Sequence, residues 1–194
     1  MVLFPEKING KFARLERAMP VYANATGAEA FATWYSDSPD CRYWGNLQFV
    51  LGPEHVPYAN VKIGPGAPPL KTEQGWLTTI HAVDFEEDRV LKGWEPTPWQ
   101  KRYTFGLVLL DLEKPWIIKA MSKTPLLLPE ADYELDGYRG SVLFPGGMIL
   151  EDDGEVKIYY GAADTVECLA TARLDDLLDF CEPVKLDKLQ MPIS

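Results

Sequence analysis

The chain has 194 residues, a formal net charge of −10, and 46% hydrophobic residues that include six Trp, nine Tyr and eight Phe. The acidic balance argues against nucleic acid as a partner, because phosphate backbones are bound through a basic surface. The apolar content is enough for a packed core and excludes a disordered chain.

Short strands separated by turns dominate the sequence. The sixteen Pro and fifteen Gly residues mark the turns, as in an all-β protein. One helix is expected at the C-terminal side, TARLDDLLDFC (171–181), because its leucines and cysteine follow a helical period. The expected strands, in chain order, are GKFARLER (10–17), AFATWYS (30–36), LQFVLG (47–52), GWLTTIHAV (75–83), YTFGLVLLDL (103–112), WIIKAMS (116–122), SVLFPGGMIL (141–150) and VKIYYGAA (156–163).

A weak internal repeat predicts the architecture. Three segments, marked by Pro5, Pro69 and Pro145, share a plan: a proline, a short apolar strand, a polar turn that ends in Gly, and an aromatic-rich strand. Each is followed by a segment that we interpret as a second strand pair; the third of these is ECLATARLDDLLDF (167–180). Four-stranded units repeated in this way are typical of the blades of a β-propeller.

Three such units leave a ring open. Propellers close with typically four to eight blades, so that no apolar face or strand edge is exposed. We therefore expect residues 1–194 to form a single partial propeller domain, the C-terminal part of a larger one. A truncated reading frame and a ring completed by another subunit, through association of open blade edges into an oligomer, are the alternatives.

The cysteines and the N-terminal residues indicate the cellular compartment in which the protein is expected. Cys41, Cys168 and Cys181 are odd in number and widely spaced, which favours free thiols in a reducing cytoplasm. The first residues lack the basic and apolar regions of a signal peptide. The longest apolar runs, such as GLVLLDL, are too short to span a bilayer. A cytoplasmic protein without a membrane partner is expected.

Six motifs in register carry a resemblance to a known family. They are FPEKINGKFARLER, SPDCRYWG, KIGPGAPPLKTEQGWLTTIHAV, FGLVLLDLEKP, LFPGGMI and YYGAADTVECLATARLDDLL. Together they resemble glycoside hydrolase family 130, the β-mannoside phosphorylases and mannosidases, over nearly the whole chain. The resemblance implies a five-bladed β-propeller, of which this chain supplies about three blades. It also implies cleavage of β-mannosides by inorganic phosphate, with inversion, to give mannose 1-phosphate.

The resemblance assigns three residues to phosphate. Lys62 of KIGPG and His81 match a phosphate-holding lysine and histidine, and Arg17 matches a phosphate-binding arginine. Lysine binds phosphate as a point charge, arginine binds it in a bidentate manner, and histidine can donate a hydrogen bond. Gly64 and Gly66 are expected to let the backbone bend so that Lys62 reaches the axis. Arg14 is expected to face away, because residues three apart on a strand point to opposite faces.

Three further residues are assigned to the sugar. Tyr103 and Phe144 match aromatic side chains of the sugar subsite, and Asp164 matches a carboxylate that accepts hydrogen bonds from mannose hydroxyls. No metal or cofactor is implied, since inorganic phosphate is a co-substrate. The segment FEEDRVLKGWEPTPWQKR (85–102) is longer than is usual in the family and is expected to shape a leaving-group site.

Simpler readings exist for each of these residues. Lys62 could be a solvated turn lysine, His81 a satisfied histidine at a strand end, and Asp164 a turn residue. Tyr103 and Phe144 could pack between strands. The family's catalytic Asp lies in an acidic stretch upstream of FPEKING, where this sequence begins, so the chain is expected to be inactive alone. The alternatives are a β-mannoside hydrolase and a non-catalytic carbohydrate-binding propeller fragment.

Overall fold

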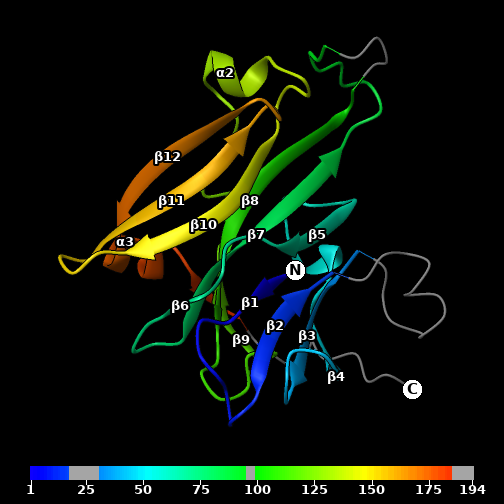
Figure 1. Cartoon of the computed structure of the whole chain (residues 1–194). Helices are drawn as coiled ribbons and strands as arrows, with labels where there is room; N and C mark the ends of the chain where they lie inside the picture. The colour runs from blue at the N-terminus through cyan, green and yellow to red at the C-terminus, as the bar shows by residue number, and fades with distance from the viewer. Residues whose placement is uncertain (18–30, 95–98, 185–194) are drawn as a thin grey trace.

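The computed structural model describes residues 1–17, 31–94 and 99–184, and these residues form three antiparallel sheets (Figure 1). The first sheet has the order β1-β2-β3-β4, the second β13-β9-β8-β7-β5 with β6 also paired to β7, and the third β10-β11-β12. The expected all-β class is confirmed. The strands are β1 (Val2–Leu3), β2 (Phe12–Glu16), β3 (Thr33–Ser38), β4 (Gly45–Leu51), β5 (Lys62–Pro65), β6 (Leu70–Lys71), β7 (Trp76–Phe85), β8 (Lys101–Leu110), β9 (Ile118–Met121), β10 (Leu143–Leu150), β11 (Glu155–Ala162), β12 (Val166–Arg173) and β13 (Glu182–Pro183).

The three repeat copies correspond to the first hairpin of each sheet. These hairpins are β1–β2, β6–β7 and β10–β11. In the first two sheets the next strand pair follows as expected, β3–β4 and β8–β9. The expectation of a strand pair in residues 167–180 is wrong. That segment holds only the strand β12, followed by the helix α3 (Leu174–Asp179), so the third sheet has three strands.

The middle sheet is buried on both faces. Alternate residues of β7 and β8 point to opposite sides, as in any strand, and here each side meets another sheet. Trp76, Ile80 and Val108 pack toward the first sheet, whereas Leu77 and Leu107 pack toward the third. This double burial explains why β8 reads as a continuous apolar run in the sequence.

Few helices accompany the sheets. Besides α3, the described residues contain a short 3₁₀ helix, η1 (Pro53–His55), and a one-turn helix, α2 (Asp132–Leu135), at one end of the long strands β7 and β8 (Figure 1). None of the described helices has the length and apolarity needed to cross a membrane. Cys41, Cys168 and Cys181 are free thiols.

Candidate active site

Strand register places Lys62, His81 and Tyr103 on one face of the middle sheet. Lys62 on β5 lies opposite Val83 on β7, and Val83 lies opposite Tyr103 on β8. Residues directly opposite each other share a face, and so do residues two apart on one strand. His81 therefore points to the same side. The Nζ atom of Lys62 lies 5.1 Å from the centroid of the Tyr103 ring. Lys62 is a half-buried strand residue, so the alternative of a solvated turn lysine is wrong.

His81 is buried beneath Phe144. The His81 side chain is only 4% exposed, and its ring centroid lies 4.8 Å from that of Phe144 on β10. Its Nδ1 atom is 3.3 Å from the carbonyl oxygen of Pro65. Phe144 itself is 42% exposed, so one face of its ring is open to solvent while the other covers the histidine.

Arg17 reaches the same place from the first sheet, just after β2. A Cβ atom built on Gly64 would lie 2.4 Å from Cε1 of His81 and 3.3 Å from Cδ of Arg17. The absence of a side chain at Gly64 thus lets the histidine and the arginine lie together over the β5 backbone. Arg14 lies apart, paired with Glu16 at 2.8 Å and placed over the Trp44 ring.

The expectation that Gly64 bends the backbone is wrong, because Gly64 lies in the regular strand β5. The chain bends only after Gly66, at Ala67, and neither glycine has a positive φ. Both positions are restricted by close packing instead. A Cβ atom on Gly66 would lie 2.4 Å from Oγ1 of Thr79 and 2.5 Å from Cγ of Pro145, and real Cβ atoms do not tolerate such distances.

The local charge at this cluster is positive although the chain is acidic. Burial lowers the pKa of His81 to about 3, and the positive charges of Arg17 and Lys62 act in the same direction. His81 is therefore neutral at physiological pH. Two cations beside a buried neutral imidazole form a place where a small anion can be held against the net charge of the chain.

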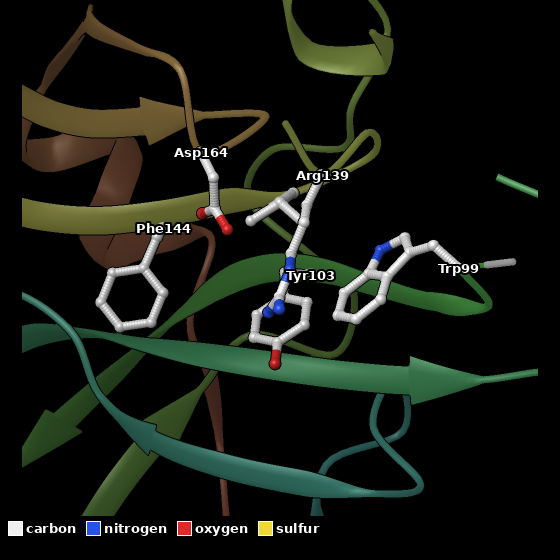
Figure 2. A pocket seen from close by; sticks show the side chains of 6 residues that line it. Trp99, Tyr103, Arg139, Phe144 and Asp164 are labelled. Atoms are coloured by element: carbon white, nitrogen blue, oxygen red, sulfur yellow. The ribbon is translucent and has the colours of Figure 1, made fainter. Parts of the chain in front are cut away.

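A cavity of about 190 Å³ adjoins the cluster (Figure 2). It shares Tyr103 and Phe144 with the cluster, and Figure 2 shows the Asp164 carboxylate close to Phe144. The volume is below the roughly 300–1,000 Å³ of drug-sized pockets, so it suits one small ring rather than an oligosaccharide. The lining residues are Trp99, Tyr103, Arg139, Val142, Phe144 and Asp164.

A tight turn presents Asp164 to the cavity. Ala163 and Asp164 have φ values of 49° and 52°, the left-handed values of a type I′ hairpin turn. The amide of Thr165 donates to the carbonyl of Ala162 at 3.0 Å, and that of Ala163 donates to Val142 at 2.8 Å. Left-handed backbone outside glycine costs about 1–3 kcal/mol and is frequent at functional sites.

All six predicted site residues therefore lie around one connected region, contributed by the three sheets. Their roles toward phosphate and sugar stay predictions, because no ligand contact tests them. Asp164 does lie in a turn, as the alternative expected. Its carboxylate is nevertheless exposed, so the turn does not prevent it from contacting a ligand.

Sequence reasoning missed Trp99 and Arg139. The Trp99 and Tyr103 rings stack at 6.2 Å, and the Arg139 guanidinium lies 4.8 Å from the Trp99 ring. Trp99 belongs to the long segment expected to shape a leaving-group site; residues 95–98 of that segment lie outside the described residues. Gly137 and Gly140 flank the arginine, and glycines also lie close to Lys62, at positions 64 and 66; this spacing was an available signal.

Comparisons with known proteins identify the family of the chain. A family model described as β-1,4-mannooligosaccharide phosphorylase matches residues 1–183. The chain belongs to glycoside hydrolase family 130. The resemblance found in the motifs is confirmed, and with it the expected relation to mannoside phosphorylases.

Relatives in family 130 are named as phosphorylases. A β-1,2-mannobiose phosphorylase from Listeria innocua is 36% identical over 178 residues, which cover 92% of this chain and 44% of that protein. A β-1,4-mannooligosaccharide phosphorylase from Ruminococcus albus is 34% identical over 181 residues, covering 92% of this chain and 49% of that protein.

A solved structure supports the same grouping. The Listeria innocua β-1,2-mannobiose phosphorylase in complex with β-1,2-mannobiose matches with a TM-score of 0.75 and 34% identity, covering 92% of this chain and 45% of that one. The chain thus spans about half the length of the curated relatives that it matches.

Proposed function

We propose that this chain supplies the phosphate-binding part and a portion of the mannose-binding part of a β-mannoside phosphorylase. The observation that supports the proposal is the convergence of Arg17, Lys62 and His81 beside a cavity lined by Tyr103, Phe144 and Asp164. The cations hold inorganic phosphate as co-substrate, the aromatic rings contact the sugar, and the carboxylate accepts hydrogen bonds from its hydroxyls.

The chemistry fits a site rich in cations. A hydrolase that inverts configuration needs a second carboxylate to activate water. Phosphate is already nucleophilic, so its oxygen can attack C1 of the mannosyl unit while the C1–O bond to the leaving sugar breaks. The products are mannose 1-phosphate of inverted configuration and a sugar that takes up a proton from a general acid. A site using water gains little from Arg17 and Lys62.

The three sheets are proposed as blades of a five-bladed propeller that residues 1–194 only partly supply. Among the residues that line the described cavity, Asp164 is the one carboxylate, and we assign it to hydroxyl binding. No described residue is then assigned as general acid. The chain alone is therefore proposed to bind phosphate and mannose without turning β-mannosides over, and its compartment is proposed to be the cytoplasm.

Phosphate binding tests the proposal. Calorimetry on the purified chain is expected to show binding of inorganic phosphate, and Lys62→Ala is expected to weaken it about 10- to 100-fold, the effect of one charge-assisted hydrogen bond. Lys114→Ala is the matched control, because Lys114 is an exposed lysine in a turn. An absence of phosphate binding, or equal losses in both variants, would contradict the assignment.

Turnover separates the two enzyme classes. With β-1,2- or β-1,4-mannobiose the chain is expected to release no sugar, with or without phosphate. Release of mannose in phosphate-free buffer would favour the hydrolase alternative, and formation of mannose 1-phosphate would show that the chain is active without further segments.

A further inference from the structure

The orientation of His81 fixes where its proton lies. Its Nδ1 atom faces the Pro65 carbonyl oxygen at 3.3 Å, and a carbonyl oxygen can only accept a hydrogen bond. Nδ1 therefore carries the proton. A neutral imidazole has a single N–H group, so Nε2 presents a lone pair. The sequence-based expectation that His81 donates a hydrogen bond to phosphate does not fit this arrangement.

Nε2 is an acceptor that no described residue pairs with, on a side chain that is largely buried; the atom is not among the fully buried unpartnered atoms, so a ligand can reach it. The side chain is 4% exposed, and within the part of the chain that the structure describes Nε2 makes no hydrogen bond. A Cβ atom on Gly64 would lie 2.9 Å from Nε2 and 3.3 Å from Cδ of Arg17. The lone pair and the arginine side chain thus lie over the same glycine.

Burial and the nearby positive charges both disfavour a second proton on the His81 ring. Burial is the largest cause that lowers the His81 pKa, followed by the Arg17 charge; Lys62 and the N-terminal ammonium also act in this direction. The hydrogen bond to Pro65 opposes them only in part. Phe144, which covers the ring, carries no charge. The lone pair at Nε2 is therefore kept over the physiological pH range.

We propose that His81 makes this site selective for oxyanions that carry a hydroxyl group, because Nε2 accepts that hydroxyl's proton in a hydrogen bond. The inference rests on the proposed function, in which Arg17 and Lys62 hold the anion. Hydrogen phosphate and hydrogen arsenate can donate to Nε2 while their charged oxygens face the cations. Sulfate has no proton to donate, so one of its oxygens would face the lone pair of a buried acceptor.

A comparison of three anions tests the selectivity. At about pH 8.5 phosphate is present mainly as the dianion that keeps one proton, and sulfate has the same charge without a proton. Calorimetric titration of the whole chain is expected to give similar affinities for phosphate and arsenate and an affinity at least about 10-fold lower for sulfate, the cost of an unmade hydrogen bond to a buried group. Equal affinities for phosphate and sulfate would overturn the inference and leave the proposed function standing. Binding of neither would overturn both.

A variant and a spectroscopic measurement complete the test. In His81→Gln the side-chain amide can present an N–H to the anion, so the preference for phosphate over sulfate is expected to fall to near one, with thermal unfolding as the check of the fold. Nitrogen-15 NMR of the imidazoles in the unliganded chain is expected to show a protonated Nδ1 for His81, with His55→Gln identifying the second of the two histidines. A protonated Nε2 in the free protein would overturn the inference whatever the variant does.

Discussion

At the scale of single residues, an acidic chain makes an anion site by local arrangement. The net charge of −10 acts over the whole surface, where salt screens it within about 8–10 Å. The charges of Arg17 and Lys62 act directly on the buried His81. Interactions at short range in a partly buried place are screened much less, so two cations decide the local preference.

Gly64 is the residue on which this arrangement depends most. Gly64→Ala would place a Cβ atom 2.4 Å from the His81 ring. The ring or the β5 backbone must then move, which typically costs about 1–3 kcal/mol of folding stability. We expect a lower midpoint in denaturant and a loss of phosphate binding of at least about 10-fold, since both His81 and Arg17 are displaced.

Gly45→Ala is the control for this substitution. Gly45 lies in β4, and a Cβ atom there would meet nothing within 4 Å. Its unfolding midpoint and its phosphate affinity are expected to stay close to those of the parent chain. If the Gly64→Ala and Gly45→Ala chains bound phosphate with equal affinity, close packing at Gly64 would not determine the phosphate affinity of the site.

Residue identities could be predicted from the sequence only in part. Lys62 and His81 are neighbours in the sequence motif and occupy adjacent strands, so their proximity was foreseeable. Arg17 comes from another sheet, and only the family resemblance joined it to them. The proton position of His81 depends on the Pro65 carbonyl, a tertiary contact that no sequence pattern contains.

At the scale of elements, the one-turn helix α2 supports the wall of the cavity. The buried Glu134 carboxylate accepts hydrogen bonds from the Tyr160 hydroxyl at 2.8 Å and from the amides of Glu130 and Ala131 at 2.8 and 3.0 Å. The Glu134 carbonyl accepts from the Ser141 amide, and the Ser141 carbonyl accepts from the Tyr103 amide. Glu134 thus links Tyr160 on β11 to Ser141, near Arg139 in the sequence. Ser141 in turn holds the backbone of Tyr103 on β8.

This carboxylate predicts an acid-dependent loss of stability. Burial alone would raise the Glu134 pKa, but the hydrogen bonds from Glu130, Ala131 and Tyr160 outweigh it and the pKa is lowered. A lowered folded-state pKa gives stability that is present above the unfolded value of about 4.3 and is lost as pH falls through the folded value.

Glu134→Gln tests this link. At pH 7 the variant is expected to be about 1–3 kcal/mol less stable than the parent chain, because buried donors lose a charged acceptor. The difference should shrink as the pH falls below about 4. Denaturant unfolding at several pH values measures it. A difference that stays constant down to the acid unfolding limit would mean that the carboxylate charge contributes nothing.

The elements themselves differ in how far the sequence predicts them. Strands such as β7 and β8 carry long apolar runs and were predicted. The helix α3 was predicted, but its start was placed at Thr171 rather than Leu174, because β12 continues the sheet up to Arg173. The helix α2 was missed: four residues have no helical period to detect, and its stability comes from the contacts of Glu134.

At the scale of the whole molecule, the packing of three sheets sets the geometry of the site. One apolar cluster lies between the first and second sheets and another between the second and third. Arg17 comes from the first sheet, Lys62 and His81 from the second, and Phe144 and Asp164 from the third (Figure 1). The site is therefore assembled only when both interfaces form, which periodicity within single strands cannot predict.

The central claim is that one ligand can contact both the cation cluster and the cavity. Mannose 1-phosphate joins the two chemistries in a single molecule, so its titration into the nitrogen-15-labelled chain, followed by amide and side-chain NMR shifts, tests the claim most directly. We predict that the largest shifts occur together at Arg17, Lys62 and His81 and at Phe144 and Asp164, all saturating with one dissociation constant. Shifts confined to exposed lysines such as Lys114, or separate dissociation constants for the two groups, would contradict it.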